Sequence, residues 1–179
     1  MEQRLDASIA LLERTPGALS AWLRGLPDRW TLCNEGEGTW SAFEIVAHLI
    51  HAERADWIPR LRMILEVGDR EAFKPFDRVG YNASGKTMSD LLEEFASVRA
   101  ENLTQLGALH LSESDMQRKG RHPMFGEVTL SQLLATWVTH DLTHMHQLSR
   151  VLAHQYRAEV GPWVAFLGVL KCTGHSELG

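Results

Sequence analysis

Apolar residues return every three or four positions through most of the chain, which is the spacing of one face of an α-helix. The first such segment runs from Glu2 to about Arg24. Pro16-Gly17 is expected to break or bend it and Pro27 to end it, because proline removes a helical hydrogen bond and clashes with the preceding turn. A polar loop from Cys33 to Thr39 follows.

The clearest helix start lies at Ser41. Glu44 stands three residues later, so the hydroxyl and the carboxylate can each accept a free backbone N–H of the first turn, which is a capping box. This helix is predicted to run to about Val67 with a kink at Pro59. The nineteen residues from Gly68 to Lys86 show no periodicity, and a loop of that length in a compact domain is more often functional than idle.

Two more long helices are predicted, from Thr87 to about Leu109 and from Thr129 to about Tyr156, each with a box-like cap at its start. Trp163 to Leu170 is expected to form a short fifth helix. No segment shows a convincing series of strands. The pattern therefore predicts an all-α fold, a four-helix bundle with a short extra C-terminal helix, as a single domain over residues 1–170 and a tail over 171–179.

The fourth long helix carries the most informative pattern. Six of its residues advance by four, three, four, three and four positions, which is the stripe that faces the interior of a bundle. They are Leu133, Trp137, His140, His144, Gln147 and Val151. Half of this stripe is polar, and burying a polar group without a partner costs roughly 1–3 kcal/mol. Two successive inward histidines therefore need a shared explanation.

A bound metal ion would supply that explanation, with the histidines as its ligands. His140 and His144 lie one turn apart, about 6 Å along the axis, so both imidazoles can reach one ion. His48, among apolar neighbours of the second helix, is the candidate for a third ligand from a facing helix. Either parallel or antiparallel packing of the two helices could place it at the same depth in the bundle as His140 and His144. The alternative is a pair of hydrogen-bonded core histidines. His51, one turn after His48, could be a hydrogen-bond partner of a ligand, an alternative ligand or a surface residue, and the surface is the expected place. His146 points away from His144 towards solvent or an interface.

Three residues of the same helix are candidates for the surroundings of the metal. Trp137 precedes His140 by one turn and is expected in the core, where it could wall a pocket. Gln147 lies near His144 and could hydrogen-bond a ligand or be a satisfied core residue. Asp141 and Gln147 are the nearest candidates for a general base, and no residue is assigned as catalytic.

Other metal motifs fit less well. His140-Asp-Leu-Thr-His144 has the shape of the zinc-protease helix motif with Asp141 in place of glutamate, but no third ligand is evident downstream beyond Glu159. A carboxylate-bridged di-iron bundle needs Glu-x-x-His on two helices, whereas Glu44 stands four residues before His48. No nucleophile elbow, P-loop or dinucleotide fingerprint is present in the sequence.

Composition narrows the class of protein further. The formal net charge of −5 gives no electrostatic reason to expect nucleic acid, and no apolar run approaches the ~20 residues of a membrane span. Cys33 and Cys172 are too few and too far apart for a disulfide scaffold or a cysteine zinc cluster. The start of the chain does not read as a signal peptide, so a cytoplasmic location is expected.

These residues, in this order, resemble the DinB/YfiT-like superfamily. The match rests on Trp40-Ser41, Glu44, His48-Leu49, Thr129-Leu130, Leu133-Leu134, Trp137, His140-Asp141, His144, Gln147 and Gly161-Pro162-Trp163. The resemblance implies an up-down-down-up four-helix bundle, frequently a homodimer, with a divalent-metal site formed by His48, His140 and His144. His146 departs from the family, whose members more often carry a small or basic residue there.

The resemblance also implies a range of activities. Members of the family include thiol S-transferases that use bacillithiol or mycothiol, a maleylpyruvate isomerase and suggested metal-dependent hydrolases. We therefore expect a metal-dependent thiol S-transferase of the bacillithiol, mycothiol or glutathione type. A metal-dependent hydrolase and a non-catalytic metal-binding stress protein are the alternatives. The expected ion is zinc or nickel, with iron or manganese as further candidates, and the expected partners are a small-molecule substrate and a second copy of the chain, with neither nucleic acid nor membrane.

Overall fold

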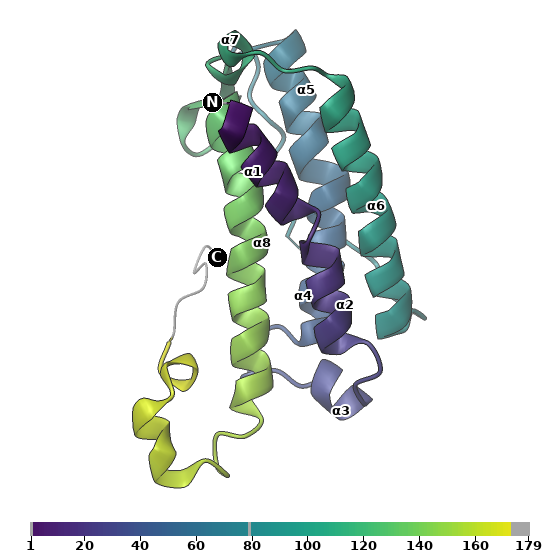
Figure 1. Cartoon of the computed structure of the whole chain (residues 1–179), viewed down its shortest axis with the longest axis vertical. Helices are drawn as coiled ribbons and strands as arrows, with labels where there is room; N and C mark the ends of the chain where they lie inside the picture. Colours follow the sequence, from purple (N-terminus) through teal and green to yellow (C-terminus); the bar gives the residue numbers. More distant parts are fainter. Residues whose placement is uncertain (1, 79, 173–179) are drawn as a thin grey trace.

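The computed structural model describes residues 2–78 and 80–172, which are mostly helical. Four helical arms lie side by side, and a small hairpin stands at one end of the bundle (Figure 1). In chain order the elements are α1 (Glu2–Leu12), α2 (Thr15–Leu23), α3 (Asp28–Thr31), α4 (Ala42–Ala52), the π-helical turn η1 (Glu53–Trp57), α5 (Ile58–Glu66), α6 (Met88–Ala108), α7 (Glu113–Met116), β1 (Lys119–His122), β2 (Gly126–Thr129), α8 (Leu130–His154), and the 3₁₀ turns η2 (Gly161–Phe166) and η3 (Gly168–Leu170).

The four arms have the predicted up-down-down-up order. The first arm is α1 and α2, the second is α4, η1 and α5, and the third and fourth are α6 and α8. The second and third arms run in the same direction, opposite to the first and fourth (Figure 1). Two parallel neighbours need a connection that returns along the whole bundle, which is why the segment from Gly68 to Lys86 is long.

The predicted helix starts are confirmed. At Ser41, Thr87 and Thr129 the hydroxyl accepts the backbone N–H three residues later, and the side chain at that position reaches back to the capping residue. The first arm breaks after Leu12, and Pro16 lies in the first turn of α2, where its missing N–H costs nothing.

The helix predicted from Ser41 to Val67 is interrupted earlier than its proline. The interruption is the π-helical turn η1, and Pro59 stands in the first turn of α5 beyond it. The extra residue of a π turn turns the two halves of the arm relative to each other. The α-helix is thus interrupted near the predicted place, but by a π-helical turn that begins at Glu53.

Two predictions about the rest of the chain need correction. Residues 119–129, expected to lack strands, form an antiparallel hairpin in which Lys119 pairs with Thr129, and its turn uses Gly126 at a φ of 72°. The short fifth helix is two 3₁₀ turns instead of one α-helix. Of the predicted tail, only residues 171 and 172 are described, and residues 173–179 lie outside the described part of the chain.

The interior has two apolar clusters separated by a polar layer. One cluster surrounds Trp57 and Trp137, and the other surrounds Ile45 and Phe95. The buried polar side chains between them are Glu53, His48, Arg99, Asn102, Asp141 and His144. Within the described residues, no helix is long and apolar enough to cross a membrane. The middle of the bundle is therefore where chemistry-bearing side chains meet.

Candidate metal centre

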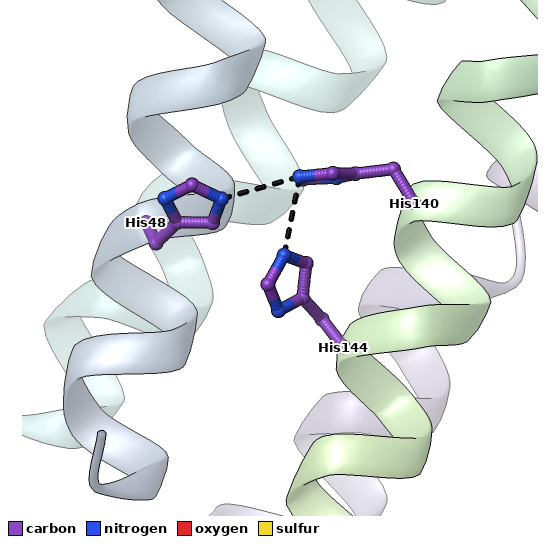
Figure 2. Close-up of side chains that lie close together, drawn as sticks. All are labelled: His48, His140 and His144. Atoms are coloured by element: carbon purple, nitrogen blue, oxygen red, sulfur yellow. Dashed lines mark hydrogen bonds between the residues drawn. The ribbon is translucent and has the colours of Figure 1, made fainter. Parts of the chain in front are cut away.

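Three histidines converge in this middle layer. His48 comes from α4, and His140 and His144 come from successive turns of α8, which runs antiparallel to α4 (Figure 2). Nε2 of His140 lies 3.2 Å from Nε2 of His48 and 3.1 Å from Nε2 of His144. One ligand atom from each residue lies within 4.8 Å of the other two. The structure thus brings together the three residues that the sequence singled out.

Hydrogen bonds outside the cluster set the protonation of two of the rings. Nδ1 of His48 donates to the carbonyl oxygen of Arg78 at 3.2 Å, and Nδ1 of His144 donates to Oε1 of Gln147 at 2.8 Å. Because these oxygens only accept, the proton of each neutral ring sits on Nδ1 and the lone pair of Nε2 points into the cluster. This is the outer hydrogen bonding of metal-ligating histidines, which orients the ring and raises its basicity.

Electrostatics favour the neutral, metal-binding form of all three rings. Burial, and then the charge of His144, lower the pKa of His48 to about 4. Burial is also the main cause that lowers the pKa of His140 and of His144. The positive charge of Arg78, whose carbonyl oxygen accepts from His48, also acts to lower the pKa of each of the three. At neutral pH the cluster therefore presents lone pairs and no protonated imidazole.

The spacing of the nitrogens fits a divalent ion. Two atoms 3.1–3.2 Å apart subtend about 100° at a point about 2.1 Å from both, the usual zinc–imidazole distance. With Nδ1–H on His48 and His144, only His140 could donate to either neighbour through Nε2, and one proton cannot make two good hydrogen bonds. A cation would satisfy all three lone pairs together. The residues present therefore fit a divalent metal ion.

Aromatic rings surround the three histidines. The ring of Trp40 lies 4.7 Å from that of His48, and Phe76 meets His48 edge-on at 5.7 Å. Trp57 approaches His140 edge-on with ring centres 5.1 Å apart. These rings exclude water and lower the local dielectric constant, which strengthens electrostatic interactions inside the site.

The loop predicted to be functional contributes directly to this site. Phe76 and Arg78 both belong to it, and neither was a candidate from the sequence because the loop has no periodicity to assign a facing side. Trp57 was not singled out from the sequence, and Trp40 entered only among the residues that carry the family resemblance. Only the folded arrangement shows that they touch the histidines.

The remaining predicted residues separate into two groups. Gln147 contacts the cluster through its bond to His144. Trp137 and Asp141 bond elsewhere: Nε1 of Trp137 donates to Glu53 at 2.7 Å, and both carboxylate oxygens of Asp141 accept from Arg99, at 2.7 and 2.9 Å. Trp137 stacks at 5.9 Å against Trp57, the ring that contacts His140.

The two neighbouring histidines lie outside the cluster. His51 was expected at the surface, but it is half-buried because the loop covers it: its ring lies 5.0 Å from that of Phe76. Gly80 comes so close that an added Cβ would lie 2.8 Å from Nε2 of His51. His146 is exposed, as its position on the helix predicts.

Comparisons with known proteins agree with this fold. A family model described as the DinB superfamily matches residues 11–148. YfiT from Bacillus subtilis, described as "a probable metal-dependent hydrolase with an unusual four-helix bundle topology", superposes with a TM-score of 0.73 at 20% identity, over 87% of this chain and 89% of that one. The four-helix bundle protein TT2238 gives a TM-score of 0.56 at 21% identity, over 83% and 98%. At these identities the likeness shows the fold alone. No curated protein matches the sequence significantly.

Proposed function

This chain belongs to the DinB superfamily, and on that premise we propose that it is an enzyme that uses a divalent metal ion held by His48, His140 and His144. The observation that supports this proposal is a pair of hydrogen bonds, from Nδ1 of His48 to Arg78 and from Nδ1 of His144 to Gln147. These bonds turn the Nε2 lone pairs of both rings towards His140. Zinc and nickel suit three neutral imidazoles best, and iron and manganese are the further candidates.

The reaction that we propose is thiol S-transfer. A divalent ion at this site would lower the pKa of a thiol or a water that reached it, and would thereby make a nucleophile near neutral pH. Arg78 adds a positive charge that favours an anionic sulfur over a neutral one. In the reaction a sulfur–carbon bond forms, the bond from carbon to its leaving group breaks, and the thiol proton is released. The thiol would be of the bacillithiol, mycothiol or glutathione type.

Metal-dependent hydrolysis of an ester or amide is the second candidate. The observation that favours it is the similarity in fold to YfiT, which is itself described as a probable hydrolase. The aromatic walls around His48 and His140 suit either reaction, because both need water excluded except for the reacting molecule.

Metal content tests the site. We would measure zinc, nickel, iron and manganese in the untagged protein and in His48→Ala, His140→Ala and His146→Ala. About one ion per chain is expected in the wild type and in His146→Ala, which removes an exposed histidine of the same helix. The other two variants should lose it. Equal content in all four proteins, or none in the wild type after metal is offered, would overturn the proposed site.

Two assays separate the candidate functions. In cobalt-loaded protein, millimolar glutathione or bacillithiol should shift the visible spectrum, and the protein should accelerate formation of the thioether from 1-chloro-2,4-dinitrobenzene. Hydrolysis of p-nitrophenyl acetate without any response to thiols would replace the transferase by the hydrolase. If neither activity appears and chelation only lowers the melting temperature, the ion is a structural staple.

A further inference from the structure

A buried arginine joins the two arms of the bundle that carry the histidines. Arg99, in the middle of α6, is 1% exposed. Its Nη1 donates to Asp141 on α8 at 2.7 Å and to the carbonyl oxygen of Leu12 at 2.8 Å. Its Nη2 donates to Asp141 at 2.9 Å and to Glu53 of η1 at 2.8 Å. One guanidinium thus bridges the second and fourth arms of the bundle, through a two-pronged bond to Asp141 and a single bond to Glu53.

Glu53 is the other centre of this network. It is 1% exposed and begins the π-helical turn. Besides Arg99, its carboxylate accepts from Nε1 of Trp137 at 2.7 Å and from Nδ2 of Asn102 at 3.0 Å. Asn102 also donates to the backbone carbonyl of Glu53 at 2.8 Å, an atom whose ordinary helical hydrogen bond the wide turn disturbs. The network therefore holds the π turn in place on three sides.

The network encloses His140 on its own helix. Trp137 precedes His140 by one turn and bonds to Glu53, while Asp141 follows it directly and bonds to Arg99. On the facing arm, Glu53 stands five residues after His48 in one continuous helical path. The bonds thus fix the separation of the two arms at the depth where the histidines meet.

We propose that Glu53 and Arg99 are positioning residues of the metal centre: they hold His48 at the distance from His140 that one ion requires, and with Asp141 they place a net negative charge behind it. The inference rests on the proposed function, because it needs a metal to be positioned. Two carboxylates against one guanidinium leave a charge of −1 in an apolar interior. Such a charge favours a nearby cation.

Stability alone is a poor reason for these charges. Replacing a buried ion network by apolar side chains of similar volume is often neutral or stabilising. A geometric role explains the charges better. At the boundary between the two apolar clusters, directional hydrogen bonds fix the relative position of the arms, which leucine or methionine could not do.

The test compares cobalt and zinc affinity in the wild type, Glu53→Gln and a matched core variant. Leu106 lies two turns beyond Arg99 on the same helix and is 2% exposed. It belongs to an apolar cluster, and to neither the hydrogen-bond network of Arg99 nor the three histidines. Glu53→Gln keeps the shape but replaces two acceptor oxygens by one, so it should weaken metal binding by about 10–100-fold and alter the cobalt spectrum. Leu106→Ala should destabilise the fold and leave the affinity and spectrum unchanged. Arg99→Lys, which keeps the charge but loses the fork, serves if Glu53→Gln does not fold.

A second readout does not depend on metal. Long-range ¹H–¹⁵N spectra of the imidazoles in metal-free protein report whether the Nδ1–H forms of His48 and His144 persist; they should do so in the wild type and in Leu106→Ala and mix with other forms in Glu53→Gln. Unchanged affinity and imidazole spectra in Glu53→Gln, or equal losses in both variants, would overturn the proposal. A wild type that binds no metal would refute the proposed function, and the imidazole spectra would then decide the positioning role by themselves.

Discussion

The burial of His48 should make the metal-free protein sensitive to mild acid, and His48→Gln should remove that part of the sensitivity. His48 is 7% exposed, and burial is the main cause that lowers its pKa from 6.5 to about 4. In the unfolded chain the pKa returns to about 6.5. The unfolded chain therefore binds a proton that the folded chain refuses, so the stability due to neutral His48 is complete above pH 6.5 and is lost as the pH falls towards 4.

The size of the effect follows from these two pKa values. Between pH 7 and pH 5 the protonation of His48 in the unfolded chain lowers the free energy of unfolding by about 2 kcal/mol, and the full loss at lower pH is about 3 kcal/mol. This is a large share of the roughly 5–15 kcal/mol by which a domain is stable. His140 and His144 act in the same direction, so the wild type should lose more than the share of His48.

Urea unfolding at pH 7, 6 and 5 in the presence of a chelator measures this loss. The fall in the free energy of unfolding from pH 7 to pH 5 should be about 2 kcal/mol smaller in His48→Gln than in the wild type. His146→Gln is the control, because it makes the same substitution at an exposed histidine outside the cluster. If His48→Gln keeps the full pH dependence of the wild type, the imidazole does not resist protonation in the folded protein and the electrostatic argument for a neutral cluster fails.

Three further predictions concern the metal and the packing. Zinc at about 100 times its dissociation constant should raise the free energy of unfolding by about 2.7 kcal/mol, and a chelator should reverse this in thermal melts. Gln147→Leu should weaken zinc binding about 10–100-fold in competition titrations, and unchanged affinity would show that the bond to its imidazole is irrelevant. Gly120→Ala should lower the free energy of unfolding by about 1–3 kcal/mol in urea, because its Cβ would lie 2.6 Å from Ile64 and 2.7 Å from Phe73. Gly107→Ala, whose Cβ would meet nothing within 4 Å, is the control and should be neutral or stabilising.

The elements that follow from local interactions were predictable. Capping boxes at Ser41, Thr87 and Thr129 join residues three positions apart, and each marks the observed start of a helix. The failures lie where distant contacts outweigh local preference. The hairpin of residues 119–129 gains its bonds from pairing with itself and from Phe73, whose N–H donates to Arg121. The π turn at Glu53 has no local signal, because its partners come from α6 and α8.

The candidate site divides along the same line. That His140 and His144 share a face is a property of the helix itself, since residues four apart lie one turn apart in any α-helix. An inward polar stripe was likewise visible in the sequence, because amphipathic periodicity records which side is buried. The residues that were missed, Phe76, Arg78 and Arg99, lie in an aperiodic loop or on another arm.

Local sequence thus determined the helices, their starts and the histidine pair, because those depend on contacts within a few residues. Only the tertiary structure decided that α4 and α8 run antiparallel, and hence that His48 meets that pair. The tertiary structure also decided the tautomers of the rings, the aromatic residues around them and the hydrogen-bond network of Arg99. Each depends on atoms that lie tens of residues apart in sequence, and the free energy that brings them together comes from the packing of the whole bundle.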